Sequence, residues 1–101
     1  MYLVYCPFPN ANEAKKAGKA LVEEQLSCCI NVLKSYSSIY KWKGKLTEES
    51  EYVLIAKTSD TSVDALEKKL KSIHPYEVPE IARIKVDQMN KEYEAWSKSL
   101  C

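Results

Sequence analysis

The chain has 101 residues, of which 46% are apolar and 29% charged, the composition of one ordinary globular domain. Fifteen Lys and Arg residues against fourteen Asp and Glu residues leave a formal charge of +1, and Arg83 is the only arginine. A nucleic-acid-binding surface needs an excess of cations and favours arginine, so the composition argues against nucleic acid as a partner. We therefore treat residues 1–101 as a single domain.

Scarce residue types exclude several kinds of site. Gly18 and Gly44 are the only glycines, so neither a Walker loop nor a G-x-G-x-x-G dinucleotide turn can form. His74 is the only histidine, which rules out zinc sites built on two histidines. The four cysteines lack C-x-x-C spacing and make a poor disulfide framework. No basic stretch precedes Pro7, so we expect neither a signal peptide nor a membrane span, and a reduced, cytoplasmic protein.

The N-terminal half predicts a strand, a helix and a long extended segment. Aromatic and β-branched residues over 2–6 predict a strand that ends at a proline turn. Asn10 followed by Glu13 resembles a capping box, and apolar residues then recur at helical spacing. Residues 28–42 carry no helical period and lead to a turn at Gly44.

The C-terminal half continues the alternation of strands and helices. Residues 50–57 have an unbroken apolar centre, which predicts a strand covered on both faces. Capping side chains at 58–60 precede a second amphipathic helix, which stops at Pro75. Residues 80–87 alternate as a strand does, and Asn90 can cap a short last helix. The order β-α-β-β-α-β plus a terminal helix is the ferredoxin-like split β-α-β plan, an α+β fold with both main helices on one side of an antiparallel sheet.

The segment from Cys29 to Trp42 is too long for a compact monomer. Extended, it would span about 45 Å at roughly 3.3 Å per residue, whereas a domain of this size is only about 34 Å across. The hairpin must therefore bend at a bulge or project beyond its own core. Projecting aromatic side chains on a strand with free edges invite another chain, so we expect self-association through this hairpin. The alternative is a bulged hairpin that folds back over its own sheet.

Cys6, at the end of the first strand, and His74, at the end of the second helix, are the sharpest candidate pair. If they meet, thiolate and imidazole suit copper or zinc better than hard cations. The alternative interpretation keeps Cys6 as a small buried apolar residue and His74 as the C-cap of its helix. A Cys-His nucleophilic site lacks a third orienting group, so the sequence does not indicate an enzyme.

Two further features carry a functional and a plain structural interpretation. The block 71–80 has two prolines four residues apart and can hold a ligand, or can simply turn the chain from helix to strand. Lys57, before the second helix, can face an anion or extend to solvent. Three lysines of the hairpin and the glutamates that follow them are interpreted as cross-strand charge pairs. They are Lys41, Lys43, Lys45, Glu48, Glu49 and Glu51.

Five motifs of the chain recur in a known order and spacing. They are Cys28-Cys29-Ile30-Asn31, Tyr36 with Tyr40-Lys41-Trp42-Lys43-Gly44-Lys45, Glu51 with Lys57-Thr58, His74-Pro75-Tyr76-Glu77-Val78-Pro79-Glu80, and Asn90 with Tyr93 and Trp96. The aromatic W-x-G hairpin and the H-P-Y-E-x-P-E block are the most specific of them. On these motifs, essentially the whole chain resembles the CutA divalent-cation tolerance family.

The resemblance implies a cytoplasmic homotrimer of ferredoxin-like protomers, held by strand pairing between subunits and similar to the PII signalling proteins. It implies a role in tolerance of divalent cations, copper especially, without catalysis, without a required cofactor, and without a nucleic-acid or membrane partner. Copper or another divalent cation such as zinc can bind in such proteins, and the binding implied here is weak.

The resemblance also implies two sites. The metal ligands are a cysteine closing the first strand, matched by Cys6, and two adjacent histidines, of which only His74 is present because the preceding residue is Ile73. The second site is the cleft between subunits, whose residues are Trp42, Lys57, His74, Tyr76 and Glu80. The alternative function is a PII-like regulatory trimer that binds a small anionic ligand in that cleft.

Overall fold

The computed structural model describes residues 1–101, apart from the side chain of Ser35. Strands and helices follow one another in the order that the sequence predicts. The elements are β1 (Tyr2–Phe8), α1 (Ala11–Glu23), β2 (Cys29–Trp42), β3 (Lys45–Thr58), α2 (Val63–Ile73), β4 (Ala82–Lys85) and α3 (Lys91–Lys98). Among these described residues, no helix has the length and apolar character needed to cross a membrane.

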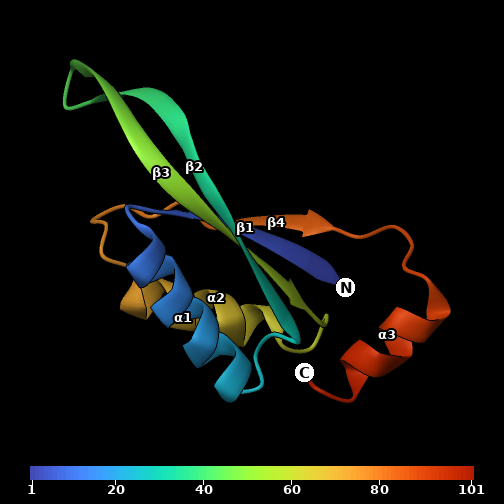
Figure 1. The fold of residues 1–101 in the computed structure, drawn as a ribbon. Helices are drawn as coiled ribbons and strands as arrows, with labels where there is room; N and C mark the ends of the chain where they lie inside the picture. The colour runs from blue at the N-terminus through green and yellow to red at the C-terminus, as the bar shows by residue number, and fades with distance from the viewer.

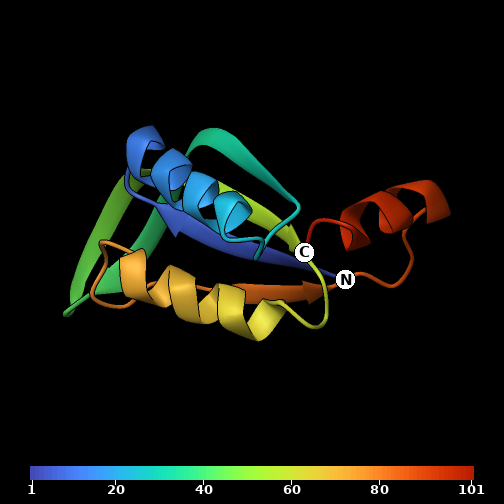
Figure 2. The same cartoon turned by 90° about the horizontal axis from the view of Figure 1, so that it is seen from below.

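The strands form one antiparallel sheet in the order β2-β3-β1-β4. Helices α1 and α2 lie side by side against one face of this sheet, and α3 lies beyond its end (Figure 1, Figure 2). This arrangement confirms the predicted α+β fold, with both long helices on one side of an antiparallel sheet.

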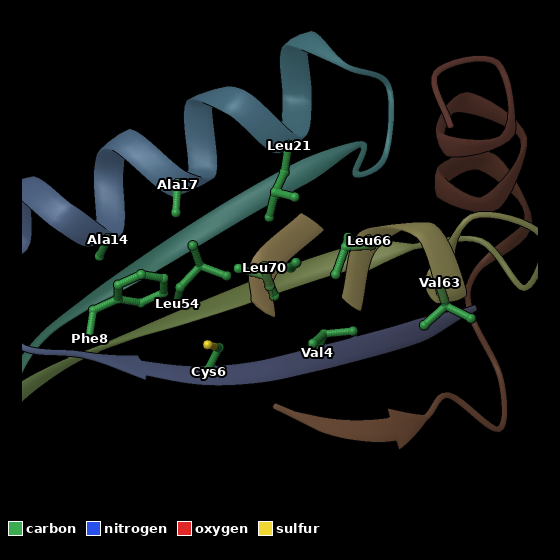
Figure 3. Packing of buried hydrophobic residues seen from close by; sticks show 11 residues of the cluster. Val4, Cys6, Phe8, Ala14, Ala17, Leu21, Leu54, Val63, Leu66 and Leu70 are labelled. Atoms are coloured by element: carbon green, nitrogen blue, oxygen red, sulfur yellow. The ribbon is translucent and has the colours of Figure 1, made fainter. Parts of the chain in front are cut away.

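The hydrophobic core lies between the sheet and these two helices (Figure 3). Val4, Cys6 and Phe8 of β1 are fully buried because alternate side chains of a strand point to the same face. They pack with residues that recur at helical spacing in α1 and α2, namely Ala14, Ala17, Leu21, Val63, Leu66 and Leu70. Each fully buried leucine contributes about 1.5–3 kcal/mol to folding relative to an exposed one.

The predicted caps have different outcomes. The side-chain oxygen of Asn10 accepts a hydrogen bond from the backbone N–H of Glu13 at 2.9 Å, which confirms the predicted start of α1. Asn90 stands at the start of α3, but its side chain makes no capping bond. Its amide instead donates to the Glu92 carboxylate at 3.4 Å, so the prediction of a side-chain cap there is wrong.

The β2-β3 hairpin both bulges and projects. The turn residues Lys43 and Gly44 have φ values of 50° and 82°, the pair of positive angles that a two-residue type I′ hairpin turn requires. The register of β2 on β3 shifts between Leu33 and Tyr36, where β2 carries one extra residue. The hairpin extends well past the helices (Figure 1), and the molecule measures 46 Å along its longest axis against 24 and 22 Å across.

Several strand limits differ from the predictions. β1 continues through Pro7 to Phe8, which is possible because β4 pairs only as far as Tyr5 and leaves β1 with a free edge at the proline. β3 starts at Lys45, five residues before the predicted strand, because the exposed half of the hairpin has no apolar run to mark it. β4 covers only Ala82–Lys85 of the predicted 80–87.

The predicted charge pairs along the hairpin are wrong in register. Glu48 faces Ile39, Glu49 faces Ser38 and Glu51 faces Tyr36, so no lysine stands opposite these carboxylates. The two-residue turn at Lys43 and Gly44 sets this register, which places Lys41 opposite Leu46 and leaves Lys45 on the same strand as the glutamates. The carboxylates of Glu49 and Glu51 therefore have no lysine opposite them, and both line the groove that is described below.

Candidate functional site

The loop that follows α2 carries His74 to the end of β1. The Nε2 atom of His74 lies 2.7 Å from the carbonyl oxygen of Pro7, and its Nδ1 atom accepts a hydrogen bond from the backbone N–H of Tyr76 at 3.1 Å. Because Nδ1 accepts, the proton of the neutral ring is on Nε2, which donates to Pro7. The ring also stacks on Phe8, with centroids 4.3 Å apart. Both ring nitrogens are thus already engaged within the chain.

Cys6 lies on the core side of the same strand. It is fully buried, and its sulfur points toward the core between the sheet and the helices (Figure 3). Its thiol is 4.0 Å from the carbonyl oxygen of Pro7, the same atom that His74 contacts. Burial, with a smaller effect of the Glu80 carboxylate, raises the pKa of the Cys6 thiol to about 12. At neutral pH Cys6 is therefore a protonated, buried side chain.

The structure therefore brings Cys6 and His74, the predicted metal pair, to the carbonyl oxygen of Pro7. Each of the two residues also takes the position that its alternative, purely structural interpretation predicts. His74 is the C-cap of α2, with its backbone N–H bonded to the carbonyl oxygen of Leu70. Across the described residues, no three His, Cys, Asp or Glu side chains are grouped as a metal site would require. A metal ion bound by Cys6 and His74 would have to displace hydrogen bonds that the fold already uses.

A groove of about 660 Å³ opens between the hairpin and the loop that follows His74. Its lining combines aromatic faces with carboxylates. The aromatic residues are Tyr40, Trp42 and Tyr76, and the acidic residues are Glu49, Glu51, Glu77 and Glu80. Among its described lining residues there is no lysine or arginine. The groove is therefore negatively charged, and a cation or a basic segment suits it better than an anion.

Glu51 is the most buried acid of this groove, and the sequence interpretation missed its role. It is only 6% exposed, and one of its carboxylate oxygens accepts the hydroxyl hydrogen of Tyr76 at 2.7 Å. Burial, together with this carboxylate, raises the pKa of the Tyr76 phenol above its usual range. The only signal in the sequence is the i, i+2 spacing of Glu49 and Glu51, which places both side chains on one face of the strand. The prediction of lysine partners gave these glutamates a different role.

The structure brings together most, but not all, of the residues predicted to line the cleft. Trp42, Tyr76 and Glu80 line the groove, and the ring of His74 contacts that of Tyr76 with centroids 4.9 Å apart. Lys57 lies elsewhere, six residues along β3 from Glu51. Its ammonium is 5.5 Å from the ring centroid of Tyr93 and 3.9 Å from the sulfur of Cys29. Neither of its two predicted environments, an anion site or open solvent, describes this contact.

Comparison with known proteins decides the family. The family model of the CutA1 divalent ion tolerance protein matches residues 2–99. The chain belongs to the CutA1 family. This result confirms the resemblance that the hairpin and the H-P-Y-E-x-P-E block indicate.

CutA relatives from distant organisms match over most of this chain. It is 42% identical to the Protein CutA homolog of Xenopus laevis over 91% of this chain, but spans only 61% of that relative, and about half of the mouse protein. It is 40% identical to the divalent-cation tolerance protein CutA of Pyrococcus horikoshii and 37% identical to that of Thermus thermophilus, and covers 93% and 91% of those chains.

Solved CutA1 structures share the fold. The Thermus thermophilus protein superposes with a TM-score of 0.92 at 36% identity, covering 99% of this chain and 98% of that one. The Pyrococcus horikoshii protein superposes with a TM-score of 0.93 at 36% identity, covering 98% and 96%. The projecting hairpin and the helix beyond the sheet are thus part of an arrangement common to these CutA1 chains.

Proposed function

We propose that this protein acts in the response to divalent cations, copper in particular, as a binding protein and not as an enzyme. The observation that carries the proposal is the match of residues 2–99 to the CutA1 family model. Relatives named divalent-cation tolerance proteins support it, because two of them match over more than nine tenths of both chains. The cytoplasm, a reducing compartment, is the location that we propose for it.

The metal contacts that we propose are Cys6 and His74, and they fit a copper or zinc ion poorly within one chain. A thiolate and an imidazole are suitable donors for these metals, but two donors fall short of the usual four. The Cys6 thiol must also lose its proton, and His74 must release either the Pro7 carbonyl or the Tyr76 N–H. Each of these changes has a free-energy cost, so this pair binds a metal ion weakly.

The charge of the groove supports a cationic over an anionic ligand. Four carboxylates without a lining lysine or arginine raise the local concentration of cations and repel small anions. The alternative of a PII-like trimer that binds an anion needs Lys57 near Tyr76 and Glu80, and within one chain Lys57 contacts Tyr93 and lies outside the groove. The arrangement of charges therefore does not favour the anion-binding alternative.

We also propose that the protein is a homotrimer that associates through the sheet face away from α1 and α2 and through the hairpin. Leu33 of β2 and Ile84 of β4 lie on this face and are each 50% exposed. On the hairpin, Ile39 and Leu46 are 67% and 75% exposed. Burial of such side chains against other copies would remove apolar surface from water.

A calorimetric titration tests the metal contacts. Copper and zinc are each added to the wild type, to Cys6→Ser and to His74→Ala in the presence of a non-thiol reductant. Cys29→Ser serves as the control, because it removes a thiol outside the proposed site. We expect weak binding that falls at least tenfold in Cys6→Ser and His74→Ala and is unchanged in Cys29→Ser. Unchanged binding in both site variants would refute the assignment, and no binding by the wild type would refute direct metal binding.

The oligomeric state is tested separately by native mass spectrometry. We expect a trimer for the wild type and a shift toward monomers for Leu33→Glu and Ile84→Glu, because each places a charge in the proposed interface. Val22→Glu is the matched control, since Val22 is 44% exposed on α1, away from that face. A monomeric wild type, or dissociation only of the Val22 variant, would contradict the proposal.

A further inference from the structure

Three cysteines that are dispersed in the sequence come together where the start of β2 meets the end of α3. The Cys28 thiol donates to the carbonyl oxygen of Lys57 at 3.5 Å, and the Cys101 thiol donates to the carbonyl oxygen of Ser97 at 3.6 Å. In both views the C-terminus, at Cys101, lies beside the start of β2, which follows Cys28 (Figure 1, Figure 2). Cys28 is buried, whereas Cys101 is partly exposed. Two thiols that are 73 positions apart in the chain thus lie in neighbouring segments of the fold.

The surroundings of this pair contain an unsatisfied polar atom. Within the described part of the chain, the hydroxyl oxygen of Tyr93 on α3 is buried and has no hydrogen-bond partner. The Tyr93 ring lies 5.5 Å from the ammonium of Lys57, which is itself 3.9 Å from the sulfur of Cys29. A buried hydroxyl without a strong partner costs free energy, so α3 gains little stability from the polar contacts it makes here.

Helix α3 is joined to the rest of the protein by few contacts. It lies beyond the two packed layers (Figure 2). Ser97, its only buried residue, contacts the Met1 sulfur at 3.7 Å, and Lys57 approaches the ring of Tyr93. Trp96 remains 50% exposed. A covalent bond between the end of α3 and the sheet would therefore change how firmly this helix is held.

We propose that Cys28 and Cys101 form a disulfide under oxidising conditions and that this bond tethers α3 to the sheet. The inference is independent of the proposed metal function, since it uses neither Cys6 nor His74. Pairing of Cys28 with Cys29, or of either with Cys6, is less favourable. Cys28 and Cys29 are consecutive, and consecutive Cα atoms are about 3.8 Å apart, below the usual range of about 4.4–6.8 Å for a disulfide. Cys6 lies in the core, on the face of the sheet that α1 and α2 cover.

A peroxide is the class of oxidant that this step requires. The partly exposed Cys101 attacks one peroxide oxygen, which breaks the O–O bond, gives a sulfenic acid and releases water from hydrogen peroxide. The Cys28 sulfur then attacks the Cys101 sulfur, the S–OH bond breaks, and a second water leaves. The two thiols lose two hydrogens and two electrons in total, and one peroxide is reduced to two waters. Burial, with the neighbouring Cys101, raises the pKa of Cys28 to about 11, so Cys28 reacts with peroxide less readily than the partly exposed Cys101 does.

The bond is tested on the full chain, fully reduced and then treated with stoichiometric hydrogen peroxide. Free thiols are alkylated, and the tryptic digest is analysed without reduction. We expect peptide 20–34 linked to peptide 99–101, with a mass lower by two hydrogens than the sum of the two. The link is lost in Cys101→Ser and in Cys28→Ser. It is retained in Cys29→Ser, the matched control that leaves Cys28 as the only cysteine of its peptide.

The tether is tested by hydrogen exchange of the same samples. We expect the backbone amides of α3 to exchange several-fold more slowly after oxidation in the wild type and in Cys29→Ser, with no change in Cys101→Ser. The proposal is overturned if the thiols stay free, if the link requires Cys29, if Cys101 instead joins two copies of the chain, or if exchange in α3 is unaffected by the bond.

Discussion

Tyr76 donates its hydroxyl hydrogen to Glu51 at 2.7 Å and so joins the loop after α2 to the base of the projecting hairpin. Both segments meet the end of β1, where Tyr52 pairs with Phe8 and His74 stacks on the same residue. Glu51 faces Tyr36 across the hairpin, and Tyr76 follows His74, which is fixed to the carbonyl oxygen of Pro7. This hydrogen bond thus holds Tyr76, on the loop side of the groove, against Glu51, on the hairpin side.

Removal of this hydroxyl destabilises the protein. In Tyr76→Phe the Glu51 carboxylate, which is 6% exposed, loses its donor while it remains in a site with little water. The expected cost is about 1–3 kcal/mol of unfolding free energy, measured by urea denaturation. Tyr52→Phe is the control, because it removes a hydroxyl from the same region that does not bond to Glu51. An equal loss in both variants would show that the bond to Glu51 is not the cause.

His74 is expected to stabilise the metal-free protein. His74→Ala removes the hydrogen bonds to Pro7 and Tyr76 and the stacking on Phe8, so we expect a loss of about 1–3 kcal/mol in urea unfolding with a chelator present. A residue kept only as a metal ligand would give little or no loss under these conditions. Nitrogen NMR of the wild-type imidazole provides a second check, since the geometry requires the Nε2–H form of the neutral ring.

The order of the elements could be predicted from the sequence because local periodicity determines it. Val63, Leu66 and Leu70 recur at helical spacing, and all three are buried as predicted. The length of the segment from Cys29 to Trp42 predicts a hairpin that bulges or projects, but it does not predict the register of the two strands. The shift between Leu33 and Tyr36 depends on how the two strands twist over the core, which no spacing in the chain records.

The loop of the candidate site could be predicted from the sequence, but the residues that this loop contacts could not. The block from His74 to Glu80 is distinctive as a sequence, and the structure places it at the groove. Its contact with Glu51 depends on the register of the hairpin, and the contact of Lys57 with Tyr93 depends on where α3 returns to the sheet. Both are contacts between residues far apart in the chain, and the sequence alone gives the positions of neither.

Gly18 provides a test of the packing between α1 and β2. A Cβ atom at this position would lie 2.8 Å from Cγ2 of Ile30, a β-branched side chain that cannot easily rotate away. Gly18→Ala is therefore expected to destabilise the protein by about 1–3 kcal/mol, even though alanine is the better helix former by about 1 kcal/mol. Lys19→Ala, at an exposed position of the same helix, is the control. Increased stability of Gly18→Ala in urea unfolding would show that β2 can move away from α1.

Stability is expected to fall at alkaline pH because of the buried Cys6 thiol. Burial raises its pKa from 9.0 to about 12, so the folded state keeps a proton that the unfolded state releases near pH 9. This contribution is therefore fully present below about pH 9 and is lost as the pH rises toward 12, with a slope of up to about 1.4 kcal/mol per pH unit. Tyr76 and Tyr36, whose phenol pKa values burial also raises, act in the same direction above pH 10.

The contribution of Cys6 is separated from that of the tyrosines by a variant that cannot titrate. Urea unfolding of Cys6→Ala, followed from pH 7 to 10.5 under reducing conditions, is expected to show a lower stability at neutral pH but a weaker decline above pH 9. Val4→Ala is the matched control, since it also truncates a fully buried side chain of β1 but leaves the Cys6 thiol in place, and it should decline as the wild type does. If the wild type and Cys6→Ala decline equally, the Cys6 thiol must ionise as easily in the folded protein as in the unfolded chain. Burial would then not raise the pKa of this thiol.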